Sequence, residues 1–140
     1  MAVLAGISVG ARAPQRSFGP VTVTDIVRYQ GASGDMNPIH HNPAFAQRAG
    51  FPSVFSVGML QAGLLANFAC DWLGYQNLRS FGVRFRDKVW PGDRLIFGAE
   101  VTAVRAKNGA RLVELELTCS REGGGAALAG TAAFELPGPG

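Results

Sequence analysis

Charged residues are scarce in this chain, and cysteine is scarcer still. Only 16% of the 140 residues are charged and the net charge is +3, so charge alone gives no reason to expect a nucleic-acid-binding protein. No basic cluster with interleaved aromatic residues supplies such a reason either. The two cysteines, Cys70 and Cys119, form no CxxC motif. We therefore expect two buried free thiols in a reducing compartment.

A basic leader and a long hydrophobic run are also missing. Residues 1–10 are apolar, but no Lys or Arg precedes them as in a secretory signal. No stretch reaches the length of a membrane span. The sequence therefore predicts a cytoplasmic protein without a membrane partner. Its length fits one domain over residues 1–140, with residues 1–10 and 137–140 loosely ordered.

Hydrophobic residues, by contrast, are plentiful. They make up 47% of the chain, which is a large share for a monomer of this size. Part of that apolar surface is expected to be buried against another chain. The sequence predicts a homodimer or a higher oligomer, and a heterodimer is also open.

Three helices are predicted in the first half of the chain. The first opens at Thr24, its predicted N-cap, and is broken at Gly34. Asn42 is the predicted N-cap of a short helix over residues 43–48. The third covers residues 58–73 and is apolar on nearly every side, so we expect it to be buried.

The second half of the chain has the period of β-strands. Asn108-Gly109 is a strong signal for a hairpin turn, while residues 10–20 predict only a loose segment. Three or four antiparallel strands are expected, over residues 81–85, 95–104, 112–119 and 126–136. The predicted fold class is α+β, with a curved antiparallel sheet that wraps a long central helix.

A heptapeptide between the first two helices carries the strongest functional signal. It reads Gly-Asp-Met-Asn-Pro-Ile-His and places Asp35 and His40 five residues apart, on either side of an Asn-Pro turn. Pro38 fixes its own φ and keeps Asn37 out of the α region, so the two side chains can converge. An Asp and a His that hold one water would form an acid/base pair near neutral pH. We predict that this loop is catalytic.

Each of these residues also has a purely structural interpretation. Asp35 could be an Asx-turn residue, and His40 could be a core histidine with its hydrogen bonds satisfied. His41 is the adjacent position and should point elsewhere. No metal site is predicted, because adjacent histidines rarely share an ion and the chain has no further His.

The chain resembles the MaoC-type dehydratases, a family of (R)-specific enoyl-thioester hydratases with the hot-dog fold. The resemblance covers roughly residues 10–136 and is carried by Tyr29, the heptapeptide 34–40, and residues 43–46, 58–60, 83–85 and 91–93. It implies a dimer and a reaction in which the Asp and His, here Asp35 and His40, add one water to a trans-2-enoyl thioester. It also implies that Gly58 offers a backbone N–H to the thioester carbonyl. No cofactor is implied beyond the CoA or acyl-carrier-protein thioester, which is the substrate.

Further residues are predicted to bind substrate. Asn37 supports the loop, and Met59 follows the glycine at the head of the long helix. Val57 stands where relatives often have His, a departure that leaves a backbone donor intact. Arg84 shares a strand face with Arg86 and Lys88, which could meet CoA phosphates across a dimer or form a solvated strand face. Glycine at a helix start is also commonly a backbone necessity, so Gly58 has a structural interpretation too.

The leading hypothesis is reversible hydration of 2-enoyl thioesters or dehydration of 3-hydroxyacyl thioesters, with syn addition of water and R specificity. A hot-dog acyl-CoA thioesterase would keep the fold, but the Asp-x-Asn-Pro-x-His loop is not expected in one. A third possibility is a subunit of a heteromeric dehydratase or an acyl-binding partner. Acyl length and branching, CoA against acyl-carrier protein, and the physiological direction are all open.

Overall fold

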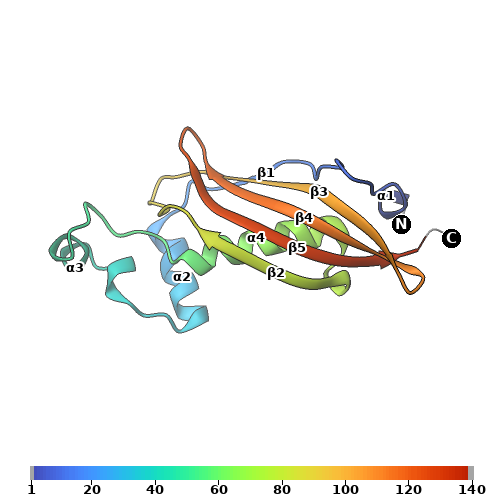
Figure 1. Ribbon diagram of the computed structural model, residues 1–140. Helices are drawn as coiled ribbons and strands as arrows, with labels where there is room; N and C mark the ends of the chain where they lie inside the picture. The colour runs from blue at the N-terminus through green and yellow to red at the C-terminus, as the bar shows by residue number, and fades with distance from the viewer. Residues whose placement is uncertain (1, 139–140) are drawn as a thin grey trace.

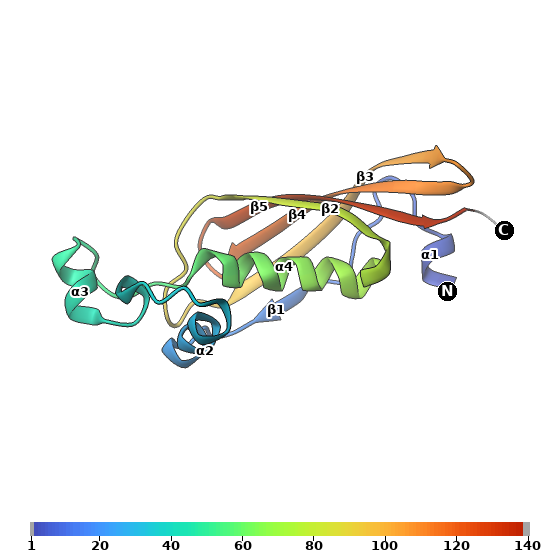
Figure 2. The ribbon, with the colours of Figure 1, turned by 90° about the horizontal axis from the view of Figure 1, so that it is seen from below.

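One five-stranded antiparallel sheet with a long helix against one face forms most of this protein (Figures 1 and 2). The computed structural model describes residues 2–138, so the chain ends predicted to be loose lie partly outside the described residues. The strand order is β1-β3-β4-β5-β2. The strands are β1 (Arg16–Phe18), β2 (Leu78–Phe85), β3 (Leu95–Lys107), β4 (Ala110–Arg121) and β5 (Ala126–Pro137). The predicted α+β class and the four later strands are confirmed.

Strand β1 was not predicted. It lies within residues 10–20, which were expected to be loose, and pairs with β3 so that Ser17 lies opposite Ile96. Three residues carry too little alternation to reveal a strand from sequence. The strand exists because the β3 edge offers unpaired backbone groups to a segment far from it in sequence.

The hairpin between β3 and β4 turns at Asn108 and Gly109, as predicted. Both residues have left-handed backbone angles, with φ of 50° and 80°. Lys107 pairs with Ala110, so the loop has two residues. Two positive φ values fit a two-residue turn whose twist matches that of the strands, and Asn and Gly tolerate them best.

Helix α4 (Gly58–Leu73) has the predicted bounds but is not buried all round. Leu65, Phe68 and Leu73 belong to the hydrophobic core shared with the strands. The opposite side of the helix carries Met59 and Asn67, which are exposed. The prediction of full burial was wrong because this single sheet covers only one side of the helix, as Figure 2 shows.

The shorter helices lie near the two ends of the sheet (Figure 2). Helix α2 (Val23–Ser33) is capped by Thr22 rather than by the predicted Thr24. The Thr22 hydroxyl accepts from the Asp25 N–H at 3.0 Å, and the Asp25 carboxylate accepts from the Thr22 N–H at 2.9 Å. Gly34 ends the helix in the left-handed region, as predicted. Helices α1 (Ala2–Ala5) and α3 (Pro43–Arg48) and two 3₁₀ turns, Pro38–His40 and Tyr75–Asn77, complete the described elements.

Helix α3 projects away from the sheet at the end where α4 begins (Figure 1). Its N-cap is Asn42, as predicted, whose side chain accepts from the Phe45 N–H at 3.1 Å. None of the described helices is both long and apolar enough to cross a membrane.

Candidate active site

The predicted catalytic loop is held by hydrogen bonds from one buried amide, that of Gln30 in the last turn of α2. Gln30 is 1% exposed, and its Nε2 donates to the carbonyl oxygens of Asp35 at 2.9 Å and Asn37 at 3.0 Å. Its Oε1 lies 2.9 Å from Nδ1 of His41. Two carbonyls can only accept, so the orientation of the amide is fixed and His41 must carry a proton on Nδ1. Sequence reasoning missed Gln30, although a polar residue in the last turn before the loop was a visible signal.

The Asp35 side chain takes part in the turn itself. Its Oδ1 accepts from the Asn37 N–H at 3.2 Å, which is an Asx turn. The Asn37 side chain in turn accepts from the Ile39 N–H at 3.1 Å and caps the 3₁₀ turn. Asp35 is exposed, and within residues 2–138 no hydrogen bond joins its carboxylate to His40. The two side chains share one loop, and the Asx turn leaves Oδ2 of Asp35 open.

His40 lies inside a cavity of about 310 Å³. It is 8% exposed, and its Nδ1 is 2.7 Å from the Phe55 carbonyl oxygen. A carbonyl only accepts, so Nδ1 carries a proton, and in the neutral form of the ring Nε2 is therefore the acceptor. The other residues that line the cavity are Phe55, Ser56, Gly58, Gln61, Phe85, Arg86, Asp87 and Lys88.

Gly58 begins α4 at the wall of the same cavity. Its N–H has no hydrogen-bond partner within the described chain, so it is free to bind a ligand. A Cβ at this position would lie 2.6 Å from the Phe85 ring. Glycine is therefore the residue that lets the ring cover the start of the helix, and sequence reasoning had not linked Phe85 to this site.

A second buried polar pair lines the cavity. The Ser56 hydroxyl lies 2.7 Å from Oε1 of Gln61, and both residues are 3% exposed. Gln61 is a polar residue on the buried face of a helix that otherwise buries apolar side chains, and that contrast was readable in the sequence. The pair adds hydrogen-bonding groups to a cavity wall that also contains aromatic residues.

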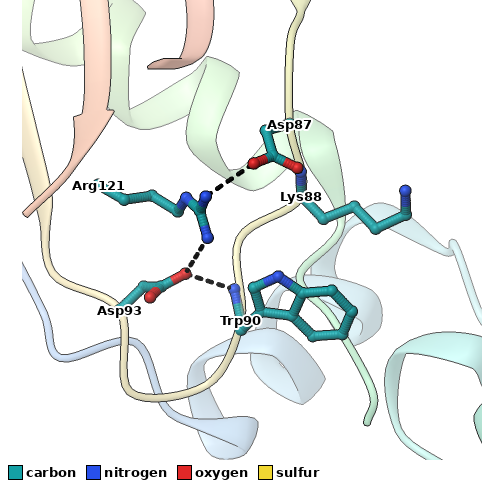
Figure 3. Close-up of polar contacts among 5 residues, drawn as sticks. All are labelled: Asp87, Lys88, Trp90, Asp93 and Arg121. Carbon is teal, nitrogen blue, oxygen red and sulfur yellow. Dashed lines mark hydrogen bonds and ion pairs between the residues drawn. The ribbon is translucent and has the colours of Figure 1, made fainter. Parts of the chain in front are cut away.

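The segment after β2 lines the cavity with Arg86, Asp87 and Lys88. Figure 3 shows the turn that follows it and the polar contacts that hold it. Arg121 on β4 binds Asp87 through Nη2 at 2.7 Å and lies 3.7 Å from Asp93 through Nη1. Asp93 also accepts from the Trp90 N–H at 2.8 Å, which closes the Trp-Pro-Gly-Asp turn. The Arg121 Nε is buried without a hydrogen-bond partner in the described chain, so this guanidinium acts through its two outer nitrogens.

The remaining predicted substrate-binding residues lie apart from the cavity. Val57 is 4% exposed and its side chain belongs to the hydrophobic core, so only its backbone faces the start of α4. Met59 is 54% exposed on the first turn of that helix. Arg84 lines a different cavity, of about 490 Å³, on the sheet. The structure thus brings His40 and Gly58 together at one cavity. The other predicted site residues lie outside its lining: Asp35, Asn37, the Val57 side chain, Met59 and Arg84.

Both cysteines are free and buried, as predicted. Burial raises the pKa of the Cys119 thiol to about 12. Burial also raises the pKa of Cys70, and the neighbouring Asp71 carboxylate adds to the rise. Within residues 2–138, no three or more His, Cys, Asp or Glu side chains gather in a way that could hold a metal ion.

Comparison with known proteins places this fold and loop in a family. A family model described as the MaoC like domain matches residues 8–122. The chain is 29% identical over 134 residues to the (R)-specific enoyl-CoA hydratase of Aeromonas caviae, which covers 94% of this chain and 96% of that protein. It is 36% identical over 104 residues to the fatty acid synthase subunit beta of Gibberella zeae, but these cover 72% of this chain and only 5% of that much longer protein.

Solved structures agree with the sequence matches. The (R)-hydratase from A. caviae involved in PHA biosynthesis has a TM-score of 0.83 and 28% identity, and the match covers 94% of this chain and 98% of that one. The ChsH1-ChsH2 complex from Mycobacterium tuberculosis has a TM-score of 0.79 and 25% identity, with 92% and 98% covered. The predicted hot-dog fold is confirmed.

Proposed function

The chain belongs to the MaoC-like domain family, and we propose that it is a hydro-lyase that hydrates 2-enoyl thioesters and, in reverse, dehydrates 3-hydroxyacyl thioesters. The cavity that holds the His40 imidazole beside the unpaired Gly58 N–H carries this proposal. It supplies a proton-transferring group and a carbonyl-binding donor around one space. The names of curated relatives, an enoyl-CoA hydratase and two 3-hydroxyacyl dehydratases among them, support the same reaction class.

Hydration requires water to lose a proton as its oxygen bonds to C3, while C2 gains a proton. We assign Asp35 as the base that takes one proton from the water and His40 as the group that orients the water. The proton held by Asp35 then passes by way of Nε2 of His40 to C2, so both side chains end in their starting protonation states. Because the Phe55 carbonyl accepts the Nδ1–H, neutral His40 can accept from the water through Nε2. If one water supplies both the hydroxyl and the proton, they add to one face of the double bond, which is syn addition. R specificity is part of this proposal.

Negative charge develops on the thioester oxygen as the double bond is attacked. The Gly58 N–H, with the positive end of the α4 dipole behind it, is the group we assign to hold that charge. One such donor typically lowers the barrier by about 3 kcal/mol, or roughly two decades in rate. Asn37 and Met59 are assigned to the loop and the rim of the site, and Val57 contributes only through its backbone. No cofactor is proposed, because the CoA or acyl-carrier thioester is itself the substrate.

The assembly is proposed to be a dimer, formed with a second copy or with a related chain, and to act in the cytoplasm. Met36, Met59 and Phe85 are each more than half exposed near the loop and the cavity. An apolar rim of this kind is typical of a surface that another chain covers. The two-subunit complex among the solved structures supports the heteromeric alternative.

The test is a spectrophotometric assay of crotonyl-CoA hydration, which follows the loss of the enoyl absorbance. We expect Asp35→Asn and His40→Ala each to lower turnover at least 100-fold, about the worth of one strong catalytic group. Glu122→Gln, at an exposed carboxylate that makes only a 3.9 Å contact with Arg94, is the matched control and should leave the rate unchanged.

A thiol reagent in the same assay separates this reaction from thioester hydrolysis. A hydratase consumes the enoyl absorbance and releases no free CoA. Release of thiol at the rate of substrate loss would identify a thioesterase instead. Wild-type turnover in both the Asp35 and His40 variants would show that the catalytic loop is wrongly assigned.

A further inference from the structure

Two basic side chains line the His40 cavity and form no ion pair with an acidic side chain among the described residues. Arg86 and Lys88 both line the cavity and are exposed. Neither takes part in any ion pair within residues 2–138, although most other basic side chains of the sheet do. The edge of the cavity therefore carries two cations that have no ion-pair partner among the described residues.

The nearby carboxylates are directed away from this charge. Asp87 lies between Arg86 and Lys88 in sequence, but its Oδ2 binds Arg121 at 2.7 Å and its Oδ1 accepts from the Lys88 backbone N–H at 2.8 Å. Asp93 is held by the same guanidinium and by the Trp90 N–H. Figure 3 shows the Lys88 side chain extending away from Arg121 and its two aspartates. Arg121 thus holds both acids of the turn and balances one of their two negative charges, and neither carboxylate pairs with the Lys88 ammonium.

Lys88 lies over two aromatic rings, one of which also packs against the imidazole. The Lys88 Nζ lies 5.2 Å from the centroid of the Phe51 ring and 5.6 Å from that of Phe55. The Phe55 ring packs edge-on against His40 with 5.2 Å between centroids, and its carbonyl holds the imidazole Nδ1. The ammonium and the proposed proton-transferring group are therefore neighbours of one and the same ring. Cation–π contact orients the ammonium and leaves its N–H donors available.

We propose that Lys88, with Arg86 beside it, binds an anionic oxygen group of the thioester substrate next to the His40 cavity. The anion is either a carboxylate on the acyl part or a phosphate on the carrier. A cation with three free donors forms charge-assisted hydrogen bonds with either group. The inference rests on the proposed function, because it gives that reaction a substrate requirement: a thioester that carries negative charge at this point is preferred over a neutral one.

Three substrates distinguish the two sources of the anion. Crotonyl-CoA carries phosphates and no acyl carboxylate, and crotonyl-pantetheine carries neither. The pantetheine monothioester of fumaric acid carries only the acyl carboxylate. Each is assayed by loss of enoyl absorbance with the wild-type protein and with Lys88→Met, Lys88→Arg and Lys107→Met. Lys107→Met is the matched control, since this substitution removes the same charge from the hairpin at the far end of β3.

We expect Lys88→Met to raise KM about tenfold or more for a substrate that carries the bound anion, with kcat little changed. Lys88→Arg should retain most of the wild-type KM, and Lys107→Met all of it. A rise with crotonyl-CoA assigns the site to a phosphate, and a rise confined to the fumaric monothioester assigns it to a carboxylate. Crotonyl-pantetheine should be insensitive to Lys88 in either case.

An equal effect of Lys88→Met on all three substrates, or no effect on any, overturns the inference. Thermal unfolding of each variant shows whether the fold is retained, and the Arg variant separates loss of charge from loss of the side chain. If the wild-type protein hydrates none of the three thioesters, the proposed function fails first. If the wild type is active and Lys88→Met changes KM for none of the three substrates, the proposed function stands without this site.

Discussion

Gln30→Met removes the amide that joins the catalytic loop to α2 while keeping a side chain of similar length. Three hydrogen bonds are lost, two to the carbonyls of Asp35 and Asn37 and one to His41. Each is typically worth about 1 kcal/mol net. The loop is exposed, so water can replace the amide at its carbonyls. We therefore expect the free energy of unfolding to fall by about 2 kcal/mol, less than the sum of the three.

The effect on turnover should be larger than the effect on stability. The amide fixes the backbone on both sides of Met36, and a displacement of about 1 Å in a catalytic group can cost about 100-fold in rate. We expect kcat for crotonyl-CoA to fall by about two decades with little change in KM. Gln47→Met, the same change at an exposed glutamine on α3, is the matched control.

A double-mutant cycle decides whether Gln30 acts through the loop. Turnover is measured for the wild type, Gln30→Met, Asp35→Asn and the double variant, and urea unfolding is measured for all four. If Gln30 positions Asp35, its removal should cost little further activity in the Asp35→Asn background. Equal losses in the two backgrounds, or an unchanged kcat in Gln30→Met, would refute the reasoning.

Three further variants test separate parts of the structure. Gly58→Ala places a methyl group 2.6 Å from the Phe85 ring, so the ring must move; kcat should fall about tenfold, and an added Phe85→Leu should restore part of it. Thr22→Ala removes the capping box of α2 and should lower the free energy of unfolding in urea by about 1 kcal/mol with kcat unchanged. Burial raises the pKa of Cys119 from 9.0 to about 12, so the unfolded thiol ionises first and stability should fall as pH rises through this range. Cys119→Ala should lose less stability over the same range, and an identical pH profile would contradict the assignment.

Local patterns predicted much of the fold. The bounds of α4, the glycine that ends α2 and the Asn-Gly hairpin all follow from residues within one turn of each other. The N-cap of α2 was assigned to the wrong threonine, although the capping-box spacing separates the two: an acidic residue, Asp25, lies three positions after Thr22, whereas Val27 lies three positions after Thr24. Strand β1 was missed since its partner lies far along the chain.

The turn of the proposed catalytic loop was predictable because its Asp, Pro and His lie within seven residues, where turn chemistry is dictated by the side chains themselves. The surroundings of that loop were not. Arg121 meets Asp87 across 34 residues of sequence, and the Phe55 carbonyl meets His40 across 15. Such contacts depend on how the sheet, the helix and the turns pack together, and no local pattern encodes that packing. The amino-acid order therefore specified the groups proposed to react, whereas folding alone determined that His40 lines a cavity, that Phe85 covers Gly58, and that the Lys88 ammonium lies beside them without an ion-pair partner in the described chain.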